Sequence, residues 1–273
     1  MANLVGAFAA SHGPLIIREW ERVPADQRSR LQQAFEELGR RITACDPDVL
    51  IVVSPDHWSN FFLDNYPAVC IGVGATNEGP PEPWMKSFPH RDIPGDADLG
   101  LHIVETALKV GFEPSFSHRL KLDHGICIPL WRMKLEKWPR IVPMIVNSIE
   151  PPLPSLRQCY LWGRLLSKAI QTYPKPLRVA ILSTGGLSHS IGEATMGAIH
   201  EDFDRETIRL FGSSERDLIR YLGRELPSRG NGSEEVRNWL VAHGAAGGRG
   251  FELVDYLPVP TVIVGCGIAA WRT

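Results

Sequence analysis

The sequence predicts an α/β fold, in which a single-domain mixed central sheet carries helices on both faces and the functional site at the carboxyl ends of its strands. Short apolar, β-branched runs alternate along the chain with longer segments whose apolar residues recur at helical spacing. The 273 residues contain no visible internal repeat and no polar linker. Residues 1–273 are therefore expected to form one domain.

Runs of Val, Ile and Leu bounded by loop-forming residues mark the strands. They are expected at residues 4–8, 49–53, 68–73, 140–146, 177–183 and 261–264. Helices are expected where apolar side chains recur every three or four positions, as at Leu31, Phe35 and Leu38. These segments cover residues 25–44, 96–110, 156–172, 200–226 (as one or two helices) and 233–243. Residues 74–94 are rich in Gly and Pro and are expected to form a long loop of the kind that is commonly functional.

Composition excludes several classes of partner. Lys and Arg number 29 against 31 acidic residues, so the net charge of −2 argues against nucleic acid or an anionic membrane held by bulk charge. No run of about 18 apolar residues predicts a membrane span. The 5 cysteines never form a Cys-x-x-Cys pair, which argues against a zinc ribbon and favours reduced thiols in the cytoplasm.

Four histidines stand where the chain is expected to leave regular structure. His12, His57 and His189 each follow a predicted strand, and His124 lies in the segment Leu-Asp-His-Gly. The carboxyl ends of strands in an open α/β sheet share one edge, which is where ligands bind. Imidazoles delivered to that edge from three strands converge in space, which indicates a metal site or an acid/base site.

Glu235 is the best candidate for an acidic partner of these histidines. It lies with Glu234 in the expected first turn of a helix that Ser233 can cap, where a carboxylate suits the helix dipole. Both acids could equally be surface residues that only compensate the dipole. Two histidines and one carboxylate on one face of a metal are typical of non-haem Fe(II) oxygenases, and the same set with a bound water serves zinc hydrolases. Asp56 either orients His57 or caps the following loop.

Together these segments resemble the class III extradiol ring-cleavage dioxygenases, the LigB-type superfamily, and among them the β subunits of protocatechuate 4,5-dioxygenases. Each segment is short, but their order and spacing along nearly the whole chain are specific. The matching segments are Ser11-His12, Asp56-His57, Leu122-Asp123-His124-Gly125, Trp138-Pro139 with Ile141-Val142-Pro143 and Val146-Asn147, Thr184-Gly185-Gly186-Leu187-Ser188-His189, and Gly232-Ser233-Glu234-Glu235 with Trp239-Leu240 and Gly244-Ala245.

The resemblance implies an Fe(II)-dependent extradiol cleavage of a catecholic or related dihydroxy or aminohydroxy aromatic ring, with both atoms of O₂ incorporated. The positions matching His12, His57 and Glu235 would hold Fe(II). The position matching His189 would be the acid/base, for which histidine suits because its ordinary pKa lies near neutrality. The position matching His124 would assist substrate binding or proton transfer. Trp58 and Trp84 could wall the aromatic pocket.

The resemblance also implies partners. Besides the aromatic diol and O₂, the chain is expected to form a homo-oligomer. The similar β subunits work with a small helical α subunit as a lid, so either a separate chain supplies that lid or the loop at 74–94 and self-association replace it. Two other functions stay open: a zinc-dependent hydrolase that uses the same His/His/Glu set, and a non-catalytic binding member of the fold.

Overall fold

The computed structural model describes residues 1–273 and contains an eight-stranded mixed sheet in the order β6-β3-β7-β2-β8-β1-β10-β9. The strands are β1 (Asn3–Ala10), β2 (Val49–Ser54), β3 (Val69–Gly72), β6 (Ser115–Ser117), β7 (Arg140–Val146), β8 (Arg178–Thr184), β9 (Phe251–Val259) and β10 (Val264–Trp271). Two further strands, β4 (Thr76–Glu78) and β5 (Asp92–Pro94), form a small antiparallel sheet of their own.

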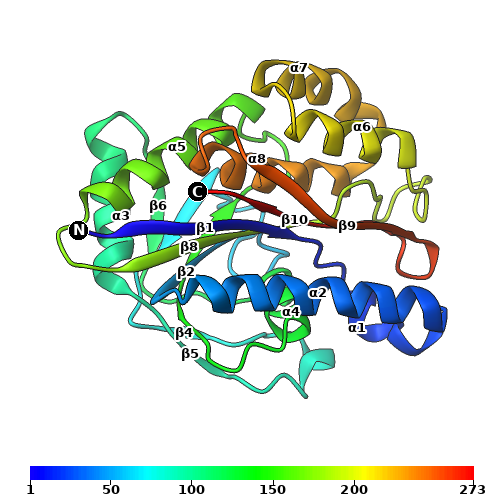
Figure 1. The fold of residues 1–273 in the computed structure, drawn as a ribbon, viewed down its shortest axis with the longest axis horizontal. Coiled ribbons are helices and arrows are strands. Elements are labelled where there is room, and N and C mark those ends of the chain that lie inside the picture. Colours follow the sequence, from blue (N-terminus) through cyan, green and yellow to red (C-terminus); the bar gives the residue numbers. More distant parts are fainter.

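Helices cover both faces of the large sheet (Figure 1). The helices are α1 (Leu15–Arg18), α2 (Ala25–Cys45), α3 (Ala97–Lys109), α4 (His124–Arg132), α5 (Leu156–Thr172), α6 (Glu201–Phe211), α7 (Glu215–Glu225) and α8 (Val236–Ala245). One face carries α1, α2 and α4, and the other carries α3, α5 and α8, with α6 and α7 beyond them. The two faces bury separate apolar clusters of 34 and 42 residues. This confirms the predicted α/β class, with helices on both sides.

Strands β2, β8 and β1 are parallel neighbours at the centre of the sheet. β2 is buried along its whole length, as expected of a strand covered by helices on both faces. Because the three strands run in the same direction, the segments that follow them leave from one edge. His12, His57 and His189 lie in these segments.

Several segments differ from the sequence prediction. Residues 74–94 are not a plain loop, since they include β4, β5 and the 3₁₀ turn η2 (Pro83–Met85). The strand predicted at 261–264 is wrong, because residues Pro260–Val262 form a 3₁₀ turn and β10 starts at Val264. The segment from 200 to 226 forms two helices. None of the helices is both long and apolar enough to cross a membrane.

Candidate active site

Three donor atoms meet at the carboxyl edge of the central strands. Nε2 of His12 lies 3.3 Å from Oε1 of Glu235, and Nε2 of His57 lies 3.5 Å from the same oxygen. The rings of His12 and His57 are nearly perpendicular, with centroids 4.9 Å apart. His12 and Glu235 are each 2% exposed. The spacing and the donor types suit one metal ion bound on one face, in the manner of a two-histidine, one-carboxylate site.

The Nδ1 atoms of His12 and His57, which face away from the cluster, also have polar partners. Nδ1 of His12 lies 3.1 Å from the Thr184 hydroxyl, at the end of β8. Nδ1 of His57 lies 3.1 Å from Oδ2 of Asp123, which also accepts the His57 backbone N–H at 2.7 Å. Such contacts fix which nitrogen carries the hydrogen and leave each Nε2 facing the centre. The site therefore fits a metal ion.

Glu235 is aimed by the backbone of the β8 loop. The Gly186 N–H donates to Oε2 of Glu235 at 2.8 Å, which leaves Oε1 for the two histidines. Glu235 ends the 3₁₀ turn η4 (Asn231–Glu235) and precedes α8. The predicted cap by Ser233 is wrong: its hydroxyl donates to the Arg229 carbonyl at 2.5 Å and accepts the His189 N–H at 3.3 Å.

His124 lies beside the same cluster at the first residue of α4. Its ring centroid is 4.1 Å from that of His57 and 5.8 Å from that of His12. Oε1 of Glu82 accepts the His124 backbone N–H at 2.9 Å and lies 2.7 Å from Nδ1 of the ring. Because an ionised carboxylate only accepts, Nδ1 carries a hydrogen and Nε2 is free. Nitrogen atoms of His12, His57 and His124 lie within 4.8 Å of one another.

His189 lies beside Glu235. Its Nδ1 lies 3.2 Å from the Leu187 carbonyl, so Nδ1 carries the hydrogen and Nε2 is the basic nitrogen. That Nε2 is 3.8 Å from Oε2 of Glu235. A β-carbon at Gly232 would lie 2.2 Å from the His189 ring, and one at Gly186 would lie 2.8 Å from it. The ring thus fits between two backbones that carry no side chain.

A buried carboxyl group supports the loop that carries His189. Asp204 of α6 accepts the Ser188 N–H at 2.8 Å, the Ser188 hydroxyl at 2.7 Å and the Tyr256 hydroxyl at 2.7 Å. Burial raises the pKa of Asp204 to about 7, against these three hydrogen bonds, which lower it. Asp204 could not be predicted from the sequence, since an acid in an amphipathic helix is typical of a surface residue.

The electrostatics of the cluster favour a positive charge between its rings. Burial opposes a charged imidazole, but Asp123 and Glu235 outweigh it and raise the pKa of His57 to about 10. Burial would raise the pKa of Glu235, yet the neighbouring imidazoles of His12 and His189 hold it well below its usual range. Burial lowers the pKa of both His189 and His124. A bound cation meets the same field as a proton, so this charge pattern also suits a metal ion.

The structure resolves the alternatives left open around the histidines. Asp56 caps its loop, accepting the N–H groups of Ser59, Asn60 and Phe61. Asp123, and not Asp56, orients His57.

The two tryptophans considered as pocket walls lie differently. The Trp84 ring centroid is 5.7 Å from that of His124. The Trp58 ring packs on Tyr66, with centroids 5.3 Å apart. Trp84 is therefore the aromatic residue that adjoins the histidine cluster.

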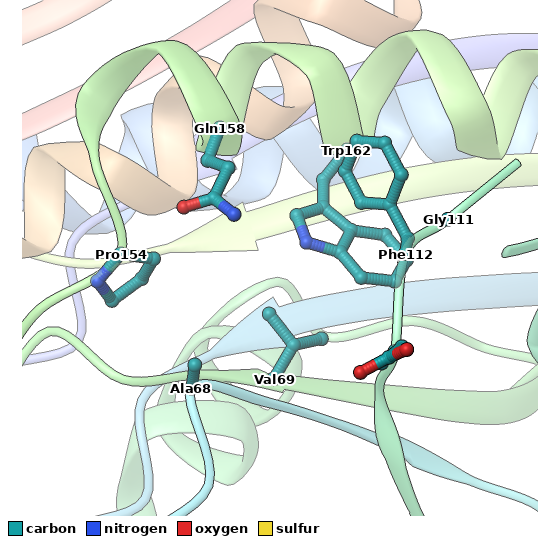
Figure 2. A pocket seen from close by; sticks show the side chains of 8 residues that line it. Ala68, Val69, Gly111, Phe112, Pro154, Gln158 and Trp162 are labelled. Carbon is teal, nitrogen blue, oxygen red and sulfur yellow. The ribbon is translucent and has the colours of Figure 1, made fainter. Parts of the chain in front are cut away.

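A separate cavity of about 280 Å³ opens between α5, the end of α3 and the start of β3 (Figure 2). Gln158 and Trp162 reach into it from α5, opposite Val69. None of the histidines or acids of the cluster lines this cavity. It plays no part in the candidate active site.

Known proteins resemble the chain along most of its length. A 2,3-dihydroxyphenylpropionate/2,3-dihydroxicinnamic acid 1,2-dioxygenase of Cupriavidus necator is 26% identical over 301 residues, covering 92% of this chain and 90% of the relative. An enzyme of the same name from Klebsiella pneumoniae subsp. pneumoniae is 31% identical over 182 residues, covering 66% and 54% respectively. The crystal structure of an uncharacterized protein from Escherichia coli K12 superposes with a TM-score of 0.64, covering 97% of this chain and 99% of that one. At 16% identity this last likeness concerns the fold alone.

The family described as the catalytic LigB subunit of aromatic ring-opening dioxygenase matches residues 6–266. This span contains all three donor side chains and both additional histidines. The expected resemblance is thus confirmed: the chain belongs to the LigB family and is an aromatic ring-cleaving dioxygenase.

Proposed function

We propose that the chain catalyses the Fe(II)-dependent extradiol cleavage of a catecholic ring, incorporating both atoms of O₂. The observation that carries the proposal is the convergence of His12, His57 and Glu235. Nε2 of His12 and Nε2 of His57 lie 3.3 and 3.5 Å, respectively, from Oε1 of Glu235. These three residues would hold the metal. Bound there, Fe(II) would take up the two catechol oxygens, favour their deprotonation and leave a position open for O₂.

The protein supplies proton transfer and orientation around that centre. Nε2 of His189 accepts a proton from the substrate hydroxyl and returns it when the ring opens, acting as general base and then general acid. His124 presents its free Nε2 to the substrate, with Nδ1 held by Glu82 at 2.7 Å. The burial of His124 and His189, 8% and 6% exposed, limits competition from water.

The bond that breaks lies beside the diol, between a hydroxyl-bearing carbon and a neighbour without a hydroxyl. Membership of the family and a neutral-imidazole, single-carboxylate donor set both favour this outcome. Cleavage between the hydroxyls would instead yield a muconate-type diacid. A ring-opened semialdehyde or keto acid, often yellow, is the expected product.

Closure of the site by its own chain is part of the proposal. Residues 74–94 contribute Glu82 and Trp84 beside His124. This supports a loop that covers the pocket without a separate lid. We further propose that residues 1–273 act as one catalytic domain that assembles into a homo-oligomer. Sedimentation with and without a candidate small subunit tests this part.

Anaerobic reconstitution with Fe(II), followed by oxygen-electrode and absorbance assays over catechols, aminophenols and dihydroxypyridines, tests the activity. We expect one equivalent of O₂ consumed per ring opened and two ¹⁸O atoms in the product after turnover under ¹⁸O₂. A parallel sample loaded with Zn²⁺ should be inactive. A product that forms without oxygen, above all in the zinc sample, would establish the hydrolase alternative.

A further inference from the structure

One arginine stands close to the site without an acidic partner. Arg18 ends α1, which begins three positions after His12. Its guanidinium carbon lies 6.0 Å from the centroid of the Trp84 ring. The side chain is exposed and forms no ion pair or hydrogen bond with a carboxylate. An unpaired guanidinium presents a planar set of donors that matches a carboxylate.

Trp84 connects this arginine to the catalytic cluster. The Trp84 centroid is 5.7 Å from that of His124, whose ring is in turn 4.1 Å from that of His57. The indole therefore lies next to both the His124 ring and the Arg18 guanidinium. A substrate whose diol lies at the cluster can extend a ring substituent along Trp84 toward Arg18.

The position of Arg18 relative to the cluster is fixed by packing. Ile16, in the middle of α1, is fully buried. Arg132, at the end of α4, donates to the Ile16 carbonyl at 2.6 Å. His124 begins that same helix, so α4 ties the guanidinium-bearing segment to a side chain of the site.

Other arginines near the site already have partners. Arg22 donates to Glu19 at 2.9 Å, and Arg229 donates to Glu225 at 2.5 Å. Arg237 is paired with Glu234. These pairs make the three guanidinium groups poorer receptors for a further carboxylate than Arg18.

We propose that Arg18 binds a carboxylate on the ring substituent of the substrate, which makes it the residue that selects catechols with an acidic side chain. The inference rests on the proposed ring cleavage for its kinetic test, and on equilibrium binding for an independent one. Loss of Arg18 should raise KM only for substrates that carry a carboxylate, because the guanidinium lies away from the bond that breaks.

The kinetic test compares 3-(2,3-dihydroxyphenyl)propionate with the uncharged 3-propylcatechol in the Fe(II)-loaded protein. Arg18→Gln should raise KM for the carboxylate substrate about tenfold or more, the effect of losing a charge-assisted hydrogen bond, and leave kcat nearly unchanged. KM for 3-propylcatechol should stay within twofold. Arg18→Lys should fall between, because it keeps the charge and loses the forked geometry. Arg22→Gln, in the next turn, is the matched control and should change neither substrate.

The binding test needs no turnover. Anaerobic calorimetry compares 3-phenylpropionate with 3-phenylpropan-1-ol, in wild type and in Arg18→Gln. The charged ligand should lose affinity in the variant and with added salt, whereas the alcohol should not. Equal effects on both ligands, or no effect on either, would overturn the role of Arg18. If no catechol is cleaved by the wild type but the binding pattern holds, the proposed reaction fails and the carboxylate site stands.

Discussion

Oε1 of Glu82 lies 2.7 Å from Nδ1 of His124 and also accepts that residue's backbone N–H at 2.9 Å. One oxygen atom thereby holds both the ring and the backbone at the start of α4. Glu82 belongs to the segment between β4 and η2, directly before η2. The contact therefore fixes the segment and the histidine together.

Replacing Glu82 should disturb His124 without removing the metal. Glu82→Ala is expected to lower kcat about 10- to 100-fold, the effect of losing a charge-assisted hydrogen bond of roughly 1.5–3 kcal/mol. Glu82→Gln keeps an acceptor for the backbone N–H and should lose less. Metal content by mass spectrometry should stay stoichiometric in both. Equal losses in the two variants would contradict a role for the acceptor oxygen.

His189→Phe should retain metal and catechol binding yet lose about 10²- to 10⁴-fold in ring cleavage, because it removes the acid/base. His124→Phe should lose less activity or divert the reaction toward other products. Anaerobic binding titrations and product analysis separate these effects. If His124→Phe is inactive while His189→Phe turns over at nearly the wild-type rate, the two roles must be exchanged.

Glu235→Ala should abolish stoichiometric iron and activity together, as should Ala at His12 or His57, because each provides one of three protein ligands. The adjacent Glu234 supplies the matched control. Its carboxylate pairs with Arg237, so Glu234→Ala should retain iron and turnover. Full iron content and activity in Glu235→Ala would refute the ligand assignment.

A buried histidine outside the site predicts loss of stability in acid. Burial lowers the pKa of His243 to about 4, while the Trp271 indole N–H donates to its Nδ1 at 3.0 Å. Below pH 6.5 the unfolded chain binds a proton here that the folded protein refuses until about pH 4. The free energy of unfolding should therefore fall by an amount on the order of 3 kcal/mol as pH drops through this window.

Urea unfolding of wild type and His243→Asn at pH 7 and pH 4.5 checks this prediction. Asparagine keeps an acceptor for Trp271 and does not titrate. The variant should therefore lose less stability on acidification than the wild type, and the difference cancels the contribution of other groups. Parallel pH dependences in the two proteins would contradict it.

The sequence predicts the parts of the fold whose pattern is local. Helix 156–172 and strand 140–146 agree with α5 and β7 at both ends. The sequence predicts no strand at β9 and only the first residue of β10. The composition of β10 is unusual for a strand, because it is rich in Gly and Ala. Pro258, the penultimate residue of β9, is tolerated because β9 lies at the edge of the sheet.

The site was predictable where motif residues follow strands, and less so where contacts are long-range. His12, His57 and His189 come together because parallel strands end at one edge. Glu235 lies 223 positions from His12. Its place at the expected start of a helix made it the best acidic candidate, and only the resemblance implied that it binds the metal. Asp123 and Glu82 approach the site through tertiary packing, which leaves no periodic signal in the sequence.

The two bare backbones around His189 limit how this pocket can be altered. Any β-carbon at Gly186 or Gly232 would collide with the imidazole. Substitution at these two positions therefore cannot reshape the part of the pocket around His189. The segment that bears Trp84, whose ring adjoins His124, is the better place to accommodate substrates of different size. Mutant libraries aimed at bulkier rings should hold the two glycines constant and diversify that segment.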